Sequence, residues 1–210
     1  MMTAVEIQEH RRAVRRSRRV LMGLVVVFLL PVVTAQVLYM SGWRPESTGN
    51  TGELVLPPRP ISDVALTTLD GGQIRFNDLR HKWTLAYFGP ADCPRRCADN
   101  LYKMRQVHTL QGKHQDRLQR VFIVTGSQGL ERLQGTLAGY PDLKTVTGPQ
   151  AGIKELARQF VLPAGSPAAG LDRIYVVDPM GNLMMSYPAD ADPAGMRKDL
   201  ARLLRVSQVG

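Results

Sequence analysis

The chain of 210 residues is poor in metal-binding side chains, with only two cysteines, Cys93 and Cys97, and four histidines. It therefore lacks the Cys/His array of a structural zinc site. It also lacks a phosphate-binding glycine loop and any pattern of Ser/His/Asp nucleophilic catalysis. The net charge is +9, but no basic stripe interleaved with aromatic residues is present. Nucleic acid is therefore not an expected partner.

Charged residues are absent from Val20 to Trp43. A helix over residues 20–40 would be roughly 31 Å long, enough to cross the hydrocarbon core of a bilayer. Residues 1–19 contain six arginines and two glutamates, a net charge of +4, and this flank predicts a cytoplasmic N-terminus. We therefore expect a basic cytoplasmic segment (1–19), a transmembrane helix (20–40) and a domain in the bacterial periplasm or an equivalent compartment.

Two other interpretations of the apolar segment remain open. It could be a cleaved signal peptide, because Val33-Thr34-Ala35 loosely resembles a cleavage site. The apolar stretch is longer than the usual signal core of about 7–15 residues, which favours a retained anchor. It could also be a buried core helix, although its length and the flanking arginines argue against that.

The rest of the chain divides into a linker and one domain. Residues 41–60 are rich in Gly, Pro, Ser and Thr, which predicts a tether between membrane and domain. The domain should span residues 61–206. Its expected elements are a hairpin (64–66 with 74–76), buried strands (83–88, 121–124, 174–177), a returning strand (183–186), and helices after the cysteines, at 130–137, at 153–160 and near 196–204. This order predicts an α/β sandwich, a mixed central sheet with helices on both faces.

Both cysteines follow the apolar strand Trp83–Phe88 and are expected at the start of the next helix. A helix N-terminus carries unpaired N–H groups and partial positive charge, which stabilise a thiolate. The positive charges of Arg95 and Arg96, between the cysteines, also stabilise a thiolate. Residues at i and i+4 lie about one turn apart, so the sulfurs can meet. They could close a disulfide or chelate a soft ion such as Cu(I).

Several stretches resemble the Sco/SenC family, and the resemblance covers about residues 60–206. They are Leu69-Asp70-Gly71-Gly72, Tyr87-Phe88-Gly89 followed by Cys93-Pro94-Arg95-Arg96-Cys97, Val146-Thr147-Gly148, and Ile174-Tyr175-Val176-Val177-Asp178-Pro179-Met180-Gly181. The resemblance implies a thioredoxin-like fold tethered to one membrane helix. It also implies a role in cytochrome c oxidase assembly at the bacterial inner membrane. The implied partners are the oxidase copper-site subunit or other assembly factors.

One departure from the family concerns copper. The family's copper site adds a histidine just before the strand that matches Ile174–Val177, but here residues 168–173 read Ala-Ala-Gly-Leu-Asp-Arg. None of His10, His81, His108 and His114 is placed in the sequence as a natural third ligand. Two thiolates can still hold Cu(I), so the missing histidine weakens the case for copper binding without excluding it and disfavours Cu(II).

Two mechanisms therefore compete for the cysteine pair. The first is thiol–disulfide exchange, with Cys93 as the attacking thiol and Cys97 as the resolving thiol. The second is Cu(I) binding by Cys93 and Cys97 together. The alternatives are a general periplasmic thiol-disulfide oxidoreductase and a non-enzymatic assembly scaffold with a structural disulfide. A loop of about five residues gains little from cross-linking, which disfavours a purely structural role.

Overall fold

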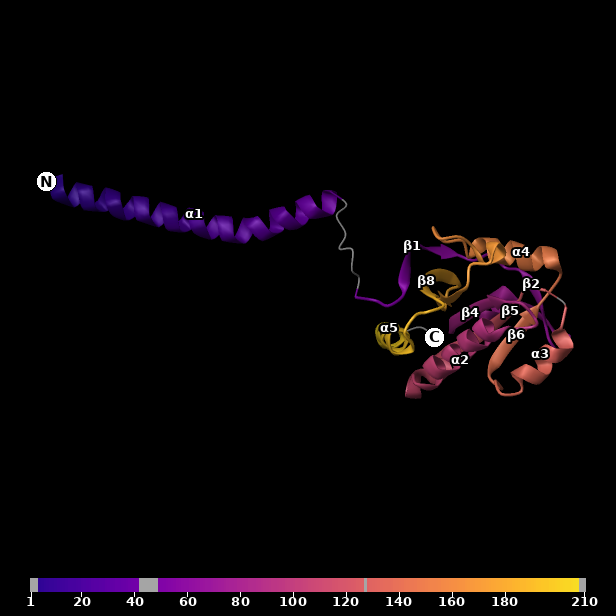
Figure 1. Cartoon of the computed structure of the whole chain (residues 1–210). Helices are drawn as coiled ribbons and strands as arrows, with labels where there is room; N and C mark the ends of the chain where they lie inside the picture. The colour runs from indigo at the N-terminus through magenta and orange to yellow at the C-terminus, as the bar shows by residue number, and fades with distance from the viewer. Residues whose placement is uncertain (1–3, 42–48, 127, 208–210) are drawn as a thin grey trace. The chain divides into compact units, whose positions relative to one another are not determined.

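The computed structural model describes residues 4–41, 49–126 and 128–207 and divides the chain into two units, Met1–Thr48 and Gly49–Gly210. The described residues of the first unit form one long helix, α1 (Ala4–Met40), drawn in indigo to purple in Figure 1. Its stretch Ser17–Met40 has a mean hydropathy of 2.5, and none of this apolar window is buried. The stretch is long and apolar enough to span a membrane.

The second unit is built on one eight-stranded mixed sheet in the order β1-β8-β7-β4-β5-β6-β2-β3. Strands β4, β5 and β6 run parallel, and every other pairing is antiparallel. The strands are β1 (Glu53–Pro60), β2 (Ala65–Thr68), β3 (Gln73–Arg75), β4 (Trp83–Gly89), β5 (Leu118–Val124), β6 (Leu143–Thr147), β7 (Arg173–Val177) and β8 (Asn182–Pro188). The helices are α2 (Arg95–Thr109), α3 (Leu130–Leu137), α4 (Gln150–Gln159) and α5 (Pro193–Val206), with 3-10 turns at Phe76–Leu79, Gly112–Arg117 and Pro167–Ala169.

Helices cover both faces of this sheet, as the sequence predicts (Figure 1). Side chains of one strand alternate between the faces, so Leu85 and Tyr87 of β4 join one core while Ala86 and Phe88 join the other. Helices α2, α3 and α5 pack on the first face, and α4 packs on the second. All seven residues of β4 are buried, so the strand that leads to the cysteines is held from both sides.

The linker expected over residues 41–60 is shorter in the structure. Residues 53–60 form β1, which pairs antiparallel with β8 through Glu53 opposite Ser186 and Leu54 opposite Met185. The prolines that suggested a tether are compatible with an edge strand, where a missing N–H is tolerated, and the register shifts between Leu54 and Arg59. Residues 42–48 of the expected linker lie outside the described part of the chain.

The segment that enters β1 is held against α5. The buried carboxylate of Asp199 accepts hydrogen bonds from the backbone N–H groups of Thr51 (2.8 Å) and Gly52 (3.0 Å). Thr51 lies close to the backbone of Gly195 in α5. A Cβ added to Gly195 would lie 2.1 Å from Thr51 Oγ1 and 2.9 Å from Thr51 Cβ. Thr51 and Gly52 are thereby fixed to the domain by both hydrogen bonding and packing.

Gly195→Ala should therefore lower the free energy of unfolding although alanine favours a helix. The added methyl group must push Thr51 away from α5, and this outweighs the gain of up to about 1 kcal/mol in helix propensity. Gly135→Ala in α3 is the matched control, because nothing lies within 4 Å of its Cβ position. Denaturant midpoints should fall for Gly195→Ala and rise for Gly135→Ala. Equal stabilisation of both variants would contradict the close contact.

Candidate dithiol site

The candidate site lies at the carboxyl end of β4. The strand ends at Gly89, where an added Cβ would lie only 3.0 Å from the rings of Tyr87 and Phe122. The two rings stack with their centroids 5.9 Å apart. The Gly89 carbonyl accepts a hydrogen bond from Thr125 N at 2.9 Å, which joins the end of β4 to the loop after β5. The loop that carries the cysteines therefore starts from a rigid point of the sheet.

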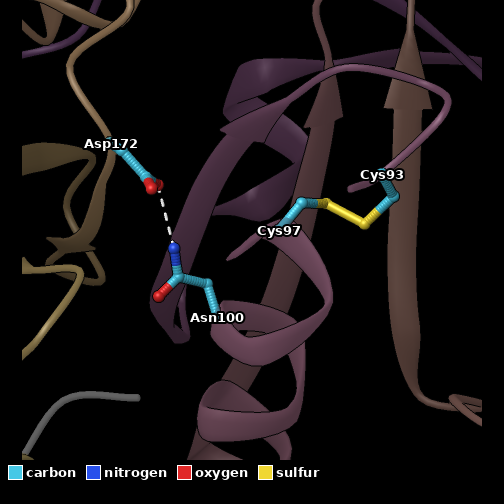
Figure 2. Close-up of a disulfide and its surroundings, with 4 residues drawn as sticks. All are labelled: Cys93, Cys97, Asn100 and Asp172. Atoms are coloured by element: carbon cyan, nitrogen blue, oxygen red, sulfur yellow. Dashed lines mark hydrogen bonds between the residues drawn. A yellow bond between two sulfur atoms is a disulfide. The ribbon is translucent and has the colours of Figure 1, made fainter. Parts of the chain in front are cut away.

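Cys93 and Cys97 are joined by a disulfide, with their Cα atoms 5.1 Å apart (Figure 2). This Cα separation lies within the normal range for the bond. Cys97 is buried, with 1% of its surface exposed, whereas Cys93 is half-buried. The structure thus brings together the two residues singled out in the sequence. It also makes Cys93 the more accessible of the two, which is the arrangement expected if Cys93 attacks and Cys97 resolves.

The helix begins after Cys93 rather than at it. Helix α2 starts at Arg95, so Cys97 lies in its first turn while Cys93 precedes it with a φ of 34°. Pro94 is the reason, because a proline disfavours helical conformation in the residue before it. No side chain caps this helix start. Its free N–H groups therefore still favour negative charge on the sulfurs.

A small polar network adjoins the disulfide and was not predicted from the sequence. The buried Asn100 side chain donates from Nδ2 to Asp172 Oδ1 at 2.9 Å, as Figure 2 shows. Arg96 Nε lies 3.1 Å from Asp172 Oδ2. The phenol of Tyr87 lies beside Asn100 and Asp172, and burial raises the pKa of Tyr87 to about 12, so it stays neutral at physiological pH. The one available signal was a polar residue, Asn100, on the apolar face of the helix.

A cleft of about 670 Å³ opens beside the cysteine loop. Pro90, Ala91 and Asp92 line one side, and residues from the ends of β5 and β6 and the start of α4 line the others. The loop is therefore bordered by a concave surface.

His108 and His81 are engaged in contacts away from the cysteine pair. Buried His108 bonds through Nε2 to the carbonyl of Leu118 at 2.9 Å, and exposed His81 donates its backbone N–H to Pro179 O. Among the described residues, no three His, Cys, Asp or Glu side chains gather as a metal-binding group. Any copper would rely on the two sulfurs, which become ligands only after the disulfide is reduced. Two thiolates are a donor set that suits Cu(I).

Stability should fall in mild acid because of His108. Its burial, reinforced by the positive charge of Arg120, holds the pKa of His108 below the usual 6.5. The unfolded chain then binds more protons than the folded chain as the pH falls below about 6.5, so the free energy of unfolding decreases. His108→Gln should flatten this decrease in denaturation curves taken between about pH 7 and pH 5. His114→Gln, which leaves His108 in place, is the control. An unchanged slope in His108→Gln would refute the assignment.

The fold and the paired cysteines define a thioredoxin-like domain. Residues 83–207 match the profile of the family described as the transmembrane-like, thioredoxin-like, C-terminal domain, which is more than half of the chain. The chain belongs to this family. No curated protein sequence matches it.

Several solved structures share this fold, Sco proteins among them. Copper-bound yeast Sco1 superimposes with a TM-score of 0.60 at 20% identity, covering 71% of this chain and 91% of that one. BsSco, described as a Sco-family cytochrome c oxidase assembly protein with a disulfide switch, gives 0.57 at 14% identity, covering 72% and 96%. The thioredoxin domain of a thiol-disulfide oxidoreductase from Bacteroides vulgatus gives 0.54 at 14%, covering 69% and 95%. The resemblance to Sco/SenC proteins is confirmed as a likeness of fold.

Proposed function

We propose that this protein assists cytochrome c oxidase assembly by thiol–disulfide exchange through Cys93 and Cys97. It would act from the bacterial inner membrane, with α1 as a single-pass anchor and the thioredoxin-like domain in the periplasm. The observation that carries the proposal is the disulfide at the uncapped start of α2, with a half-buried Cys93 and a buried Cys97. The likeness to Sco structures supports a role in oxidase assembly. It also supports the copper-site subunit of the oxidase as the partner.

The exchange runs in two steps when the pair is reduced. The Cys93 thiolate attacks one sulfur of a partner disulfide, forming a mixed disulfide and releasing the partner's other sulfur as a thiolate. The Cys97 thiolate then attacks Cys93, closing the Cys93–Cys97 disulfide and releasing the second partner sulfur. The partner gains two electrons and two protons, and this protein loses them. A reducing dithiol in the compartment would regenerate the starting state.

Cu(I) handling is the second candidate function. It is favoured by the copper-bound yeast Sco1 structure, whose fold this chain shares, and by two sulfurs close enough to bond each other. In this chain the metal would be a cargo held by Cys93 and Cys97 alone, and copper binding and disulfide formation would exclude each other.

One paired experiment separates the two candidates. The full chain in detergent is equilibrated with glutathione buffers, and the reduced chain is separately titrated with Cu(I) against a competing chelator. Exchange predicts a reversible equilibrium between dithiol and disulfide. Copper handling predicts one tightly held Cu(I) per chain, lost in Cys93→Ser/Cys97→Ser. A pair that neither cycles with glutathione nor binds Cu(I) would leave only a scaffold with a structural disulfide.

A further inference from the structure

The carboxylate of Asp172, just before β7, contacts two side chains of helix α2. Asp172 lies 72 residues from Asn100 in the sequence, yet one oxygen accepts from Asn100 Nδ2 at 2.9 Å and the other lies 3.1 Å from Arg96 Nε. Both contacted residues belong to the first two turns of α2, on either side of Cys97. The carboxylate therefore joins β7 to the part of α2 that carries Cys97 (Figure 2).

Asn100 is an unusual residue at its position. It is 1% exposed and neighbours Leu101 and Met104, which belong to the apolar core on this face of the sheet. Burying an amide costs free energy unless its polar atoms are paired, so an apolar residue would serve the core better. Asp172 accepts from Nδ2 of this amide, while the buried Oδ1 of Asn100 has no hydrogen-bond partner among the described residues, and the amide lies three residues after Cys97, on the same side of the helix. The amide therefore joins the dithiol helix to Asp172 at a position where an apolar side chain would suit the core.

The charges of Arg96 and Asp172 should affect the stability of the Cys93 and Cys97 thiolates. Arg96 lies between the cysteines, and its positive charge favours thiolates, which exist only in the reduced pair. Asp172 offsets that charge and adds a negative one nearby. The side chain of Arg96 is 77% exposed and that of Asp172 is 21% exposed, so the ion pair itself adds little to folding stability. Its main effect should fall on the balance between the reduced and oxidised pair.

We propose that Asp172 is a positioning residue that lowers the reduction potential of the Cys93–Cys97 pair by holding Arg96 and, through Asn100, the start of α2. This inference rests on the proposed exchange function and deepens it. The half-reaction it tunes is the uptake of two electrons and two protons by the disulfide, supplied by a dithiol reductant. A lower potential would make the reduced protein a stronger reductant toward a partner disulfide.

The test compares Asp172→Asn with a matched control on the same helix, Asp99→Asn. Asp99 is exposed and has no contact with the network described here. The full chain in detergent is equilibrated with glutathione buffers, and the reduced fraction is read by thiol labelling. Asp172→Asn should shift the equilibrium toward the dithiol by about tenfold, which equals about 30 mV for a two-electron couple. Asp172→Glu, which keeps the charge, should restore most of the wild-type value.

Two further variants separate charge from folding. Arg96→Gln should shift the equilibrium in the opposite direction, and Asp172→Asn should have a smaller effect in that background, because the positive charge that Asp172 offsets is gone and only its own negative charge is left to remove. A Tm close to that of the wild type shows that the variants are folded. The inference is overturned if Asp172→Asn shifts the potential no more than Asp99→Asn does. If the wild-type pair fails to equilibrate with glutathione at all, the proposed exchange function fails instead.

Discussion

Replacing Cys97 with serine is expected to trap the protein in a mixed disulfide with its partner. Cys93 would still attack, but the buried thiol that normally attacks Cys93 in turn and releases the partner would be missing. A higher-mass species should therefore accumulate on non-reducing gels of cell extracts and disappear with reductant. Mass spectrometry of the trapped species would identify the partner, for which the proposal names the oxidase copper-site subunit.

The reciprocal variant is the control. Cys93→Ser leaves only Cys97, whose surface is 1% exposed, so a partner disulfide cannot readily reach its sulfur. We expect little or no trapped species in this variant. If Cys93→Ser traps a partner and Cys97→Ser does not, the assigned roles are reversed. If neither variant traps anything, exchange on a protein partner is contradicted.

Phe160→Ala should destabilise the domain by about 3–5 kcal/mol, a large part of the stability of a domain of this size. Phe160 is fully buried at the end of α4, and its ring lies 4.9 Å from that of Phe88 and 5.2 Å from that of Tyr175, centroid to centroid. Phe76 adds a third edge contact at 6.2 Å. Removing the ring leaves a cavity among side chains from β4, β7 and the first 3-10 turn.

Chemical denaturation of the wild type and the variant measures this loss. Leu110→Ala is the control, because Leu110 is 60% exposed just after α2 and should cost less than about 0.5 kcal/mol. A loss of under about 1 kcal/mol would show that the second core contributes less than its packing indicates.

The elements that the sequence predicts well are those with a local pattern. The run Trp83–Phe88 is apolar at every position but one, and the structure shows a central strand there, buried on both faces. The i, i+3, i+4, i+7 pattern from Ile153 to Phe160 marks α4, which lies one to three residues earlier. The turn at Asp178–Asn182 closes the hairpin of β7 and β8 as expected, with Asp178 N donating to Asn182 O.

The features that the sequence does not predict depend on contacts between residues far apart in the chain. Strand β1 contains Pro57, Pro58 and Pro60, and it is a strand only because β8 offers an edge to it, more than a hundred residues later. Likewise, no local pattern joins Asp172 to Asn100. The two cysteines stand out in the sequence because they are the only two and lie four residues apart, whereas their polar neighbours come together only when β7 lies beside β4.

The most direct test of the account is oxidase assembly in cells that lack this protein and carry the Cys93→Ser/Cys97→Ser chain. Expression is matched by immunoblot, and cytochrome c oxidase activity and copper content are compared with cells carrying the wild-type chain. The account predicts that the double variant reaches the membrane at normal levels and fails to restore oxidase activity. Full restoration by the double variant would contradict it and leave a scaffold whose disulfide is structural.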